Sequence, residues 1–417
     1  MIKNKKINTI ALALSIYSQI SFSSTGIIHA EGNTLKTDAG VNVELKGFNL
    51  GSLFPLEHYM SPAGKIGIET VDTYNVMLTM EKRFGVEKQR DLISCYQNSW
   101  ITSLDFENIK MAGFNVVRIP VWWGQFYDLN NTSESGWRKD AFTQLDRIVN
   151  SAALKKIYVI IDMHGAVGGQ SLNISTGQKG LNIYWSDTAA ARSTASMWKK
   201  IADHYKDNPY IAGYDLLNEP DPRPNKETAW SGIYTKIIIN AYDELYKNIR
   251  SVDKNHTIFI EDTFYKWNLD MLPDPTTMGW TNVAYEAHVY PWPANALPGE
   301  THIAEAKRGI DSVVRDFSSH ASWKVPGYIG EFNPLENSSE TWNYAIQAFN
   351  SSSLSWTAWS YKSSNGKAPN HWGWYVRTGW PGEPDLLVDS AADIQNKWSR
   401  WKTTDAFERN ISLGIRP

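Results

Sequence analysis

Eight short apolar runs rich in β-branched residues recur along this 417-residue chain, and longer segments of helical period separate them. Such alternation is typical of repeated βα units, in which each strand is followed by a helix. Eight units in a chain of this length predict an α/β fold of the (β/α)8, or TIM barrel, type, with its active site at the C-terminal ends of the strands. The predicted strands cover residues 42–50, 115–121, 158–163, 211–219, 257–262, 282–290, 326–332 and 354–361.

Two of the intervening segments carry the apolar stripe of an amphipathic helix. The stripes are formed by Phe142, Leu145, Ile148, Val149 and Ala152 in residues 141–154, and by Ile233, Ile237, Ala241, Leu245 and Ile249 further on. A doubly wound open sheet is the structural alternative. It is disfavoured because no glycine-rich phosphate fingerprint follows any strand.

Long connections follow several of the predicted strands, notably residues 52–99, 165–185 and the Trp-rich segment 365–380. Long βα loops at the top of a barrel usually shape a binding cleft. No linker rich in Pro, Ser or Thr marks a further module, so we expect residues 31–417 to form one catalytic domain.

The composition is that of a globular protein, with 42% hydrophobic and 20% charged residues and a formal net charge of -3. Without a basic patch in the body of the chain, nucleic acid is not expected as a partner. Aromatic residues make up 13% of the chain and include 19 Trp. Two interpretations stay open: a Trp-rich core, or exposed Trp and Tyr faces that stack on sugar rings.

Residues 1–30 resemble a secretory signal, with Lys3, Lys5 and Lys6 before an apolar stretch and Ala30 as the cleavage point. The apolar stretch is too short to span a membrane, so we expect a secreted protein, extracellular or periplasmic, without membrane attachment after processing. Cys95 is the only cysteine, so no intrachain disulfide can form. We expect a monomer.

Two carboxylates end apolar runs: Glu219 in Tyr-Asp-Leu-Leu-Asn-Glu-Pro and Glu331 in Pro-Gly-Tyr-Ile-Gly-Glu-Phe. On a barrel they would close the fourth and seventh strands and face one pocket. Most glycoside hydrolases need two such groups to cleave a glycosidic bond, and here one would act as acid and the other as nucleophile. Glu219 has apolar neighbours that would keep it protonated, whereas a cation near Glu331 would keep it ionised.

Further polar and aromatic residues lie at predicted strand ends. Arg118 and Tyr290 are placed to lower the pKa of Glu331, and Asn218 to direct its amide at a sugar 2-hydroxyl. His164 and His288 lack metal-ligand spacing and are interpreted as hydrogen-bonding residues. Trp359 would provide a stacking floor. Each residue alone has an ordinary structural explanation, but their joint occurrence at strand ends favours a site.

These residues, in their order along the chain, resemble glycoside hydrolase family 5 of clan A. The likeness rests on Val-Arg-Ile-Pro at Arg118, Asp-Met-His-Gly at His164, Asn218-Glu219-Pro220, His288 with Tyr290, Ile-Gly-Glu-Phe at Glu331 and Ala-Trp-Ser at Trp359. The resemblance spans the whole mature chain and implies a retaining double displacement, with Glu219 as acid/base and Glu331 as nucleophile.

Residues 47–52 with Leu56-Glu57, and Ser99-Trp100-Ile101-Thr102, are similar to the exo-β-1,3-glucanase branch of that family. In that branch the residue corresponding to Glu57 binds the terminal glucose. The sequence His58-Tyr59-Met60 departs from the Pro-Trp of the branch, so an open cleft for endo attack stays an alternative.

The resemblance therefore predicts a secreted β-glucanase acting on β-1,3- and/or β-1,6-linked glucose, in polysaccharides or oligosaccharides. The alternatives are an endo-acting hydrolase of β-1,4-glucan, mannan or xylan, and a non-catalytic carbohydrate-binding barrel. The second alternative is disfavoured because both carboxylates are present. A serine hydrolase is disfavoured further, because no Gly-x-Ser-x-Gly elbow is present. Neither cofactor nor metal is expected, since the chemistry needs only carboxylates and water.

Overall fold

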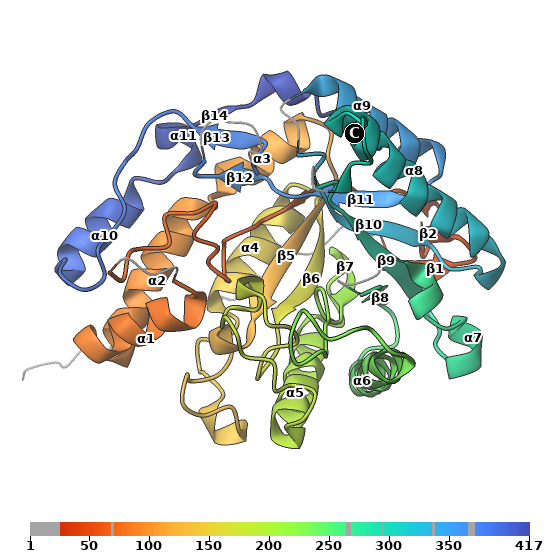
Figure 1. Ribbon diagram of the computed structural model, residues 1–417. Helices are drawn as coiled ribbons and strands as arrows, with labels where there is room; N and C mark the ends of the chain where they lie inside the picture. Colours follow the sequence, from red (N-terminus) through yellow and green to blue (C-terminus); the bar gives the residue numbers. More distant parts are fainter. Residues whose placement is uncertain (1–25, 68–70, 264–267, 293–294, 336–337, 366–371) are drawn as a thin grey trace, which may run out of the picture.

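The computed structural model describes residues 26–417 apart from 68–70, 264–267, 293–294, 336–337 and 366–371 (Figure 1). Within these residues, eight parallel strands close into a barrel in the order β10, β11, β4, β5, β6, β7, β8 and β9. Helices lie around the outside of the strands (Figure 1). The predicted (β/α)8 barrel is confirmed.

The barrel strands each fall within or overlap one predicted run. They are β4 (Lys46–Asn49), β5 (Val116–Trp122), β6 (Tyr158–Gly165), β7 (Ile211–Asp215), β8 (Thr257–Glu261), β9 (Val283–Val289), β10 (Gly327–Phe332) and β11 (Ser355–Ala358). Two smaller sheets contain β1 (Ile28–Glu31), β2 (Thr34–Thr37) and β3 (Asn42–Val43), and β12 (Lys362–Ser363), β13 (Tyr375–Arg377) and β14 (Phe407–Arg409).

Three predicted strands were too long. The run 42–50 divides into β3, which pairs with β2, and the barrel strand β4. The run 211–219 is a strand only to Asp215, because the chain then leaves the sheet. The run 354–361 ends as a strand at Ala358, since the Ser360 N–H donates to the Trp372 carbonyl instead of a barrel neighbour.

Several helices begin at residues whose side chains accept from their free N–H groups. Asp187 accepts from two amides of α5, and Ser390 and Asp393 form a capping box on α10. The helices are α1 (Thr73–Phe84), α2 (Val86–Trp100), α3 (Ser103–Met111), α4 (Thr143–Leu154), α5 (Thr188–Tyr205), α6 (Gly232–Arg250), α7 (Pro275–Met278), α8 (His302–Ser319), α9 (Ser339–Ser351), α10 (Ala391–Ser399) and α11 (Thr403–Ala406).

Both predicted amphipathic helices exist, as α4 and α6. The stripe predicted on α6 was partly wrong, because Ile233 is 61% exposed and the helix buries Ile238 and Tyr242 instead. The connection 52–99 is also not a plain loop, since it contains α1 and nearly all of α2.

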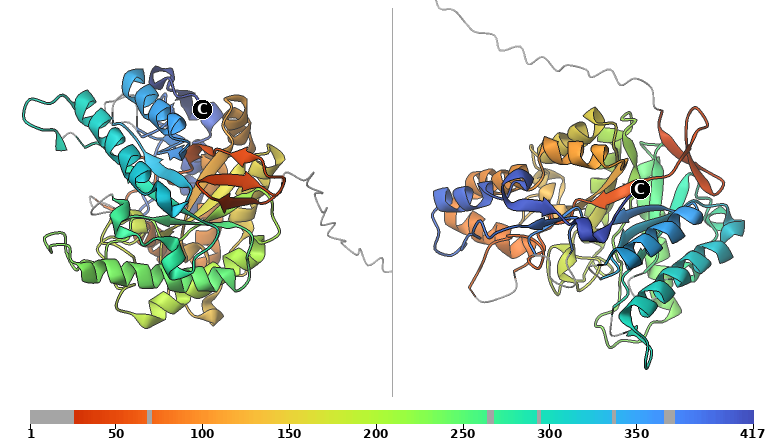
Figure 2. Two further views of the ribbon diagram at one scale, coloured as in Figure 1. Left: turned by 90° about the vertical axis from the view of Figure 1, so that its right-hand side faces the viewer. Right: turned by 90° about the horizontal axis from the view of Figure 1, so that it is seen from above.

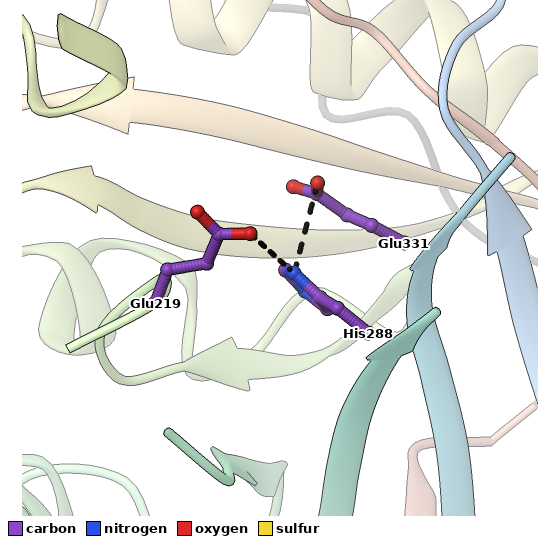
Figure 3. Close-up of side chains that lie close together, drawn as sticks. All are labelled: Glu219, His288 and Glu331. Carbon is purple, nitrogen blue, oxygen red and sulfur yellow. Dashed lines mark hydrogen bonds and ion pairs between the residues drawn. The ribbon is translucent and has the colours of Figure 1, made fainter. Parts of the chain in front are cut away.

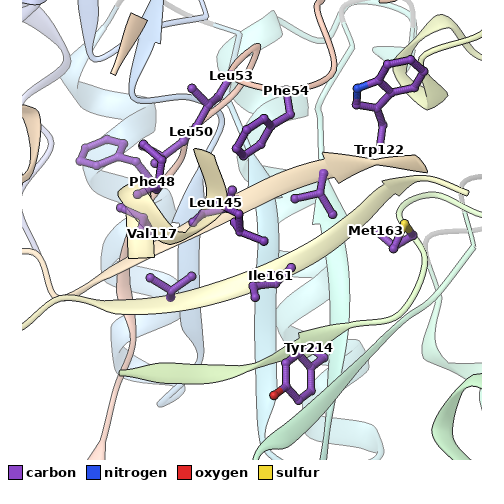
Figure 4. Close-up of a cluster of buried hydrophobic side chains, with 14 of the residues drawn as sticks. Phe48, Leu50, Leu53, Phe54, Val117, Trp122, Leu145, Ile161, Met163 and Tyr214 are labelled. Atoms are coloured by element: carbon purple, nitrogen blue, oxygen red, sulfur yellow. The ribbon is translucent and has the colours of Figure 1, made fainter. Parts of the chain in front are cut away.

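The main hydrophobic core fills the layer between the barrel and the helices. Phe48, Val117, Ile161 and Tyr214 point outward from neighbouring strands into this layer, where Leu145 of α4 meets them (Figure 4). Most of the Trp side chains that are fully buried belong to this core. The first of the two interpretations, a Trp-rich core, thus accounts for much of the aromatic content.

The N-terminal hairpin of β1 and β2 lies against one end of the barrel (Figure 2). β1 packs against β7, β8 and β9, and Ile28 and Leu35 join a separate apolar cluster at this end. The Ala30 N–H donates to Asn282 Oδ1 at 2.7 Å. The expected cleavage point after Ala30 therefore lies inside β1. An intact hairpin requires a chain that keeps residues 28–31. Most of the expected signal, residues 1–25, lies outside the described residues.

Candidate active site

Glu219 and Glu331 meet across a cavity of about 540 Å³ that both side chains line. Glu331 lies on β10, whereas Glu219 lies beyond the end of β7 and does not close that strand as predicted. One carboxylate oxygen of each lies within 4.8 Å of the other. Both carboxyls face the ring of His288 on β9, whose Nδ1 is 3.2 Å from Glu219 and 3.7 Å from Glu331 (Figure 3).

Arg118 is fully buried next to this pair. It is the third residue of β5 rather than its last, so the prediction that it ends the strand was wrong. Its side chain points into the barrel, where its guanidinium nitrogens approach Asp215 at 2.7 Å, Glu331 at 2.8 Å, Asn218 at 2.9 Å, Asn49 at 3.0 Å and Asp162 at 3.1 Å. Burial lowers the pKa of Arg118, but the surrounding carboxylates outweigh it and raise the pKa well above its usual range.

The two carboxyls differ in their surroundings. Burial first, and then the charge of Glu331, raise the pKa of Glu219 to about 8, as its apolar setting predicted. Burial also raises the pKa of Glu331, so the expected net lowering was wrong. Arg118 and the Tyr290 hydroxyl, which donates to Glu331 at 2.7 Å, oppose that rise as predicted. Of the two carboxyls, only Glu331 forms an ion pair with Arg118, which favours its charged form relative to that of Glu219.

Asn218 is oriented by the same arginine. Its Oδ1 accepts from Arg118, which leaves the NH₂ group of the amide for the cavity that Asn218 lines. Its backbone is held as well, because its N–H donates to Met163 and its carbonyl accepts from Gln170. The side chain is thus set as a donor toward a bound molecule.

His164, Glu57 and Trp359 form another wall of the cavity. The rings of His164 and Trp359 are nearly parallel with centroids 5.5 Å apart, and His164 Nε2 is 3.7 Å from Glu57. Although burial lowers the pKa of His164, Asp162 at 2.7 Å and Glu57 outweigh it and raise the pKa to about 10. Trp359 follows β11 rather than lying on it as predicted. This wall therefore presents a charged imidazolium, a carboxylate and an indole together.

His288 stays neutral on the opposite side. Burial, Arg118 and His164 lower its pKa well below its usual value. Glu261 and Glu286 each lie 3.4 Å from one of its ring nitrogens. Burial raises the pKa of both these carboxyls well above the usual range. Gly330 makes room for this arrangement, since a Cβ there would lie 1.5 Å from Glu286 Oε1.

Several residues of the site were not predicted from the sequence. Tyr59 lines the cavity and its hydroxyl donates to Glu57. Trp292 and Trp372 form an aromatic wall with Tyr290, and Trp292 is 45% exposed. Asn173, Ile174 and Ser175, from the long loop after β6, complete the lining. Strand alternation could have found Asp162 and Glu286, which lie two residues before His164 and His288 on the same face.

All nine predicted site residues come together. Seven line the cavity, and Arg118 and His288 contact the carboxylates from outside the lining: the nine are Glu57, Arg118, His164, Asn218, Glu219, His288, Tyr290, Glu331 and Trp359. The nine residues therefore lie close together, as the sequence predicted. The role of each residue stays a prediction.

The described residues near the pair offer two groups with the spacing of a metal site. These are Glu219, His288 and Glu331, and Glu261, Glu286 and His288. The Arg118 guanidinium contacts Glu331 and lies 3.5 Å from Glu286, which disfavours a further cation in either group. Among the described helices, none combines the length and apolarity needed to cross a membrane.

The profile of the family described as Cellulase (glycosyl hydrolase family 5) matches residues 80–365. A β-xylosidase from Phanerodontia chrysosporium is 26% identical over 368 residues, which are 82% of this chain and 70% of that protein. Glucan 1,3-beta-glucosidase 2 of Saccharomyces cerevisiae is 25% identical over 347 residues, 73% of this chain and 60% of that protein. The chain also spans about half the length of the probable glucan 1,3-beta-glucosidases A of Neosartorya fischeri and Aspergillus fumigatus.

Among solved structures, the rutinosidase from Aspergillus niger aligns with a TM-score of 0.62 at 15% identity, over 79% of this chain and 95% of that one. The β-glucanase from Saccharophagus degradans aligns with a TM-score of 0.54 at 17% identity, over 90% of this chain and 94% of that one. At such identities the likeness concerns the fold.

Proposed function

Because the chain belongs to glycosyl hydrolase family 5 and is a glycoside hydrolase, we propose that it cleaves β-1,3- and/or β-1,6-linked glucan with retention of configuration. One observation carries the mechanism. A Glu219 oxygen and a Glu331 oxygen lie within 4.8 Å, an approach that favours the closely spaced carboxyl groups of retaining enzymes, roughly 5–5.5 Å apart, over the roughly 6.5–9.5 Å that leaves room for an inverting water.

In the first step Glu331 attacks the anomeric carbon while Glu219 gives its proton to the leaving glycosidic oxygen. The bond to the leaving sugar breaks and a glycosyl ester on Glu331 forms. The raised pKa of Glu219, about 8, supports its part as acid because it stays protonated at neutral pH.

In the second step Glu219, now ionised, removes a proton from water, and the resulting nucleophile attacks the same anomeric carbon. Glu331 leaves as a carboxylate, which restores the starting state. Its contacts with Arg118 and Tyr290 favour the charged form and thus assist its departure.

Other residues would bind the sugar unit at the point of cleavage. The Asn218 amide is placed to donate to its 2-hydroxyl, a contact that strengthens as positive charge develops on the ring. Glu57 and the His164 imidazolium offer an acceptor and a donor to other hydroxyls, and Trp359 a stacking face.

The choice of glucan rests on the named relatives and on the resemblance to exo-β-1,3-glucanases around Glu57. A β-xylosidase among the relatives keeps a xylose-containing substrate as the second candidate. The N-terminal residues support secretion as a further proposal.

Product analysis tests both parts of this proposal. The purified protein is incubated with laminarin, pustulan, lichenan, carboxymethyl cellulose, mannan and xylan, with Glu331→Ala as the control. We expect activity on laminarin and pustulan, which the variant should lose, and a β-anomer as the first product in NMR spectra.

An α-anomer as the first product would overturn the retaining mechanism. Hydrolysis of xylan alone would transfer the proposal to xylosides. Glucose alone as the early product means exo attack, and a ladder of oligosaccharides means endo attack.

A further inference from the structure

Glu219 occupies an unusual piece of backbone for a group that must be placed accurately. The chain leaves the sheet after Asp215, and Glu219 itself has a φ of 45°, in the left-handed region that costs a non-glycine residue roughly 1–2 kcal/mol. Such a conformation persists only where its surroundings hold it. The contacts on this short segment therefore decide where the Glu219 carboxyl points.

Two of these contacts come from backbone carbonyls. The Leu216 N–H donates to Phe259 and the Asn218 N–H donates to Met163. Neither depends on the side chain of its acceptor, so many sequences could supply them. The contact on Glu219 is different, because its N–H donates at 2.7 Å to a side chain, Oε2 of Glu261.

The same Glu261 also reaches the other end of Glu219. Its Oε1 lies 3.4 Å from His288 Nδ1, and that nitrogen lies 3.2 Å from the Glu219 carboxyl. One side chain thus holds the Glu219 backbone directly and also lies against the imidazole that contacts the Glu219 carboxyl.

Glu261 is itself fixed in place. It is the last residue of β8 and is 1% exposed, and the Tyr242 hydroxyl donates to its carbonyl at 2.9 Å. A carboxyl buried among Glu286, Glu219 and Asp215 is costly, as the raised pKa of Glu261 reflects. An apolar residue would fill this volume at lower cost, so packing alone does not account for a glutamate here.

We infer that Glu261 is a positioning residue that holds the Glu219 carboxyl within reach of the leaving oxygen. The inference rests on the proposed role of Glu219 as the acid. A misplacement of about 1 Å at a reacting group costs on the order of 100-fold in rate, so loss of this contact should be visible in kinetics.

The test uses leaving groups that differ in their need for an acid. Phenyl β-D-glucoside needs a proton on its leaving oxygen, whereas 2,4-dinitrophenyl β-D-glucoside does not, and the matching xylosides are run beside them. For each variant kcat/KM is measured, since it reports the steps up to loss of the leaving group. The variants are Glu261→Ala, Glu261→Gln and Glu219→Ala. The control is Asp262→Asn, next along the chain and equally buried, which interacts with Glu219 through its charge but does not accept from the Glu219 N–H.

We expect Glu261→Ala to lose about 100-fold on the phenyl glycoside and little on the dinitrophenyl glycoside. Glu261→Gln keeps an oxygen that can accept from the Glu219 N–H, so it should recover most of the loss. Asp262→Asn should affect both substrates alike and only slightly. Thermal unfolding of each variant identifies any that fails to fold. If Glu261→Ala fails to fold, the test uses Glu261→Gln and the ratio of kcat/KM for the phenyl glycoside to kcat/KM for the dinitrophenyl glycoside.

Equal losses on both substrates in Glu261→Ala, with a selective loss in Glu219→Ala, would overturn the inference and leave the proposed function in place. No selective loss in Glu219→Ala itself would instead overturn the role of Glu219 as acid.

Discussion

The inside of the barrel divides into two halves that differ sharply in chemistry. Toward the N-terminal ends of the strands it is filled by Val116, Ile160, Phe259, Ala284 and Tyr328, closed from outside by the β1–β2 hairpin. Two residues further along, four of these strands carry a charged or acidic residue: Val116 is followed by Arg118, Ile160 by Asp162, Phe259 by Glu261 and Ala284 by Glu286, whereas Tyr328 is followed by Gly330.

This difference separates stability from catalysis along these four strands. The apolar half buries surface with no polar group to satisfy, which stabilises the fold. The polar half gathers carboxylates around Arg118, and Asp162 Oδ1 is buried there without a hydrogen-bond partner. Such groups reduce stability, and they shift the pKa values that acid and nucleophile need. Substitutions in the two halves should therefore have opposite effects.

Glu331→Gln in the polar half should give the largest loss of activity. We expect kcat to fall about 10⁴-fold or more, because the nucleophile is removed. The free energy of unfolding should stay unchanged or rise, since one carboxylate fewer repels its neighbours. Chemical denaturation and kinetics of the same preparation measure both. A large drop in stability would break the proposed division.

Ile160→Ala in the apolar half should do the reverse. Loss of a fully buried isoleucine costs about 2–5 kcal/mol of unfolding free energy, as the cavity and lost burial add together. The value of kcat/KM, measured well below the unfolding temperature, should stay near that of the wild type. A comparable fall in kcat/KM would mean that the two halves are mechanically coupled.

The pH dependence of kcat/KM sharpens the comparison further. Glu219 must be protonated for the first step, and burial together with Glu331 raises its pKa to about 8, so activity should fall as the pH rises through about 8. Glu331 must be ionised, and burial raises its pKa, so activity should also fall on the acid side, at a pH above its usual 4.5. Ile160→Ala should keep this bell shape. An alkaline limb unchanged by substitution of Glu219 would contradict the assignment.

Removal of metal ions should have the smallest effect. The positive charge of Arg118 already pairs with Glu331, so we expect kcat/KM to be the same before and after dialysis against EDTA. A loss of activity that is restored by a divalent cation would contradict this expectation and point to the cluster of Glu219, His288 and Glu331.

The sequence by itself determined the barrel and the pairing of its carboxylates. Strand and helix periodicities are local properties, and eight βα units have few ways to bury their apolar faces. The residue types near strand ends then identified eight of the nine predicted site residues, since parallel strands bring their C-terminal ends to one face, whereas Glu57 came from the resemblance to the exo-β-1,3-glucanase branch.

Tertiary structure alone decided how those residues act on one another. Nothing local shows that Glu219 leaves the sheet after Asp215, because that turn is held by Met163, Phe259 and Glu261 from neighbouring strands. The net pKa of Glu331 was wrongly predicted for the same reason: its burial depends on every wall of the cavity, whereas Arg118 and Tyr290 were visible as residue types. Periodicity is encoded over a few residues, but burial and electrostatics sum over groups far apart in the chain.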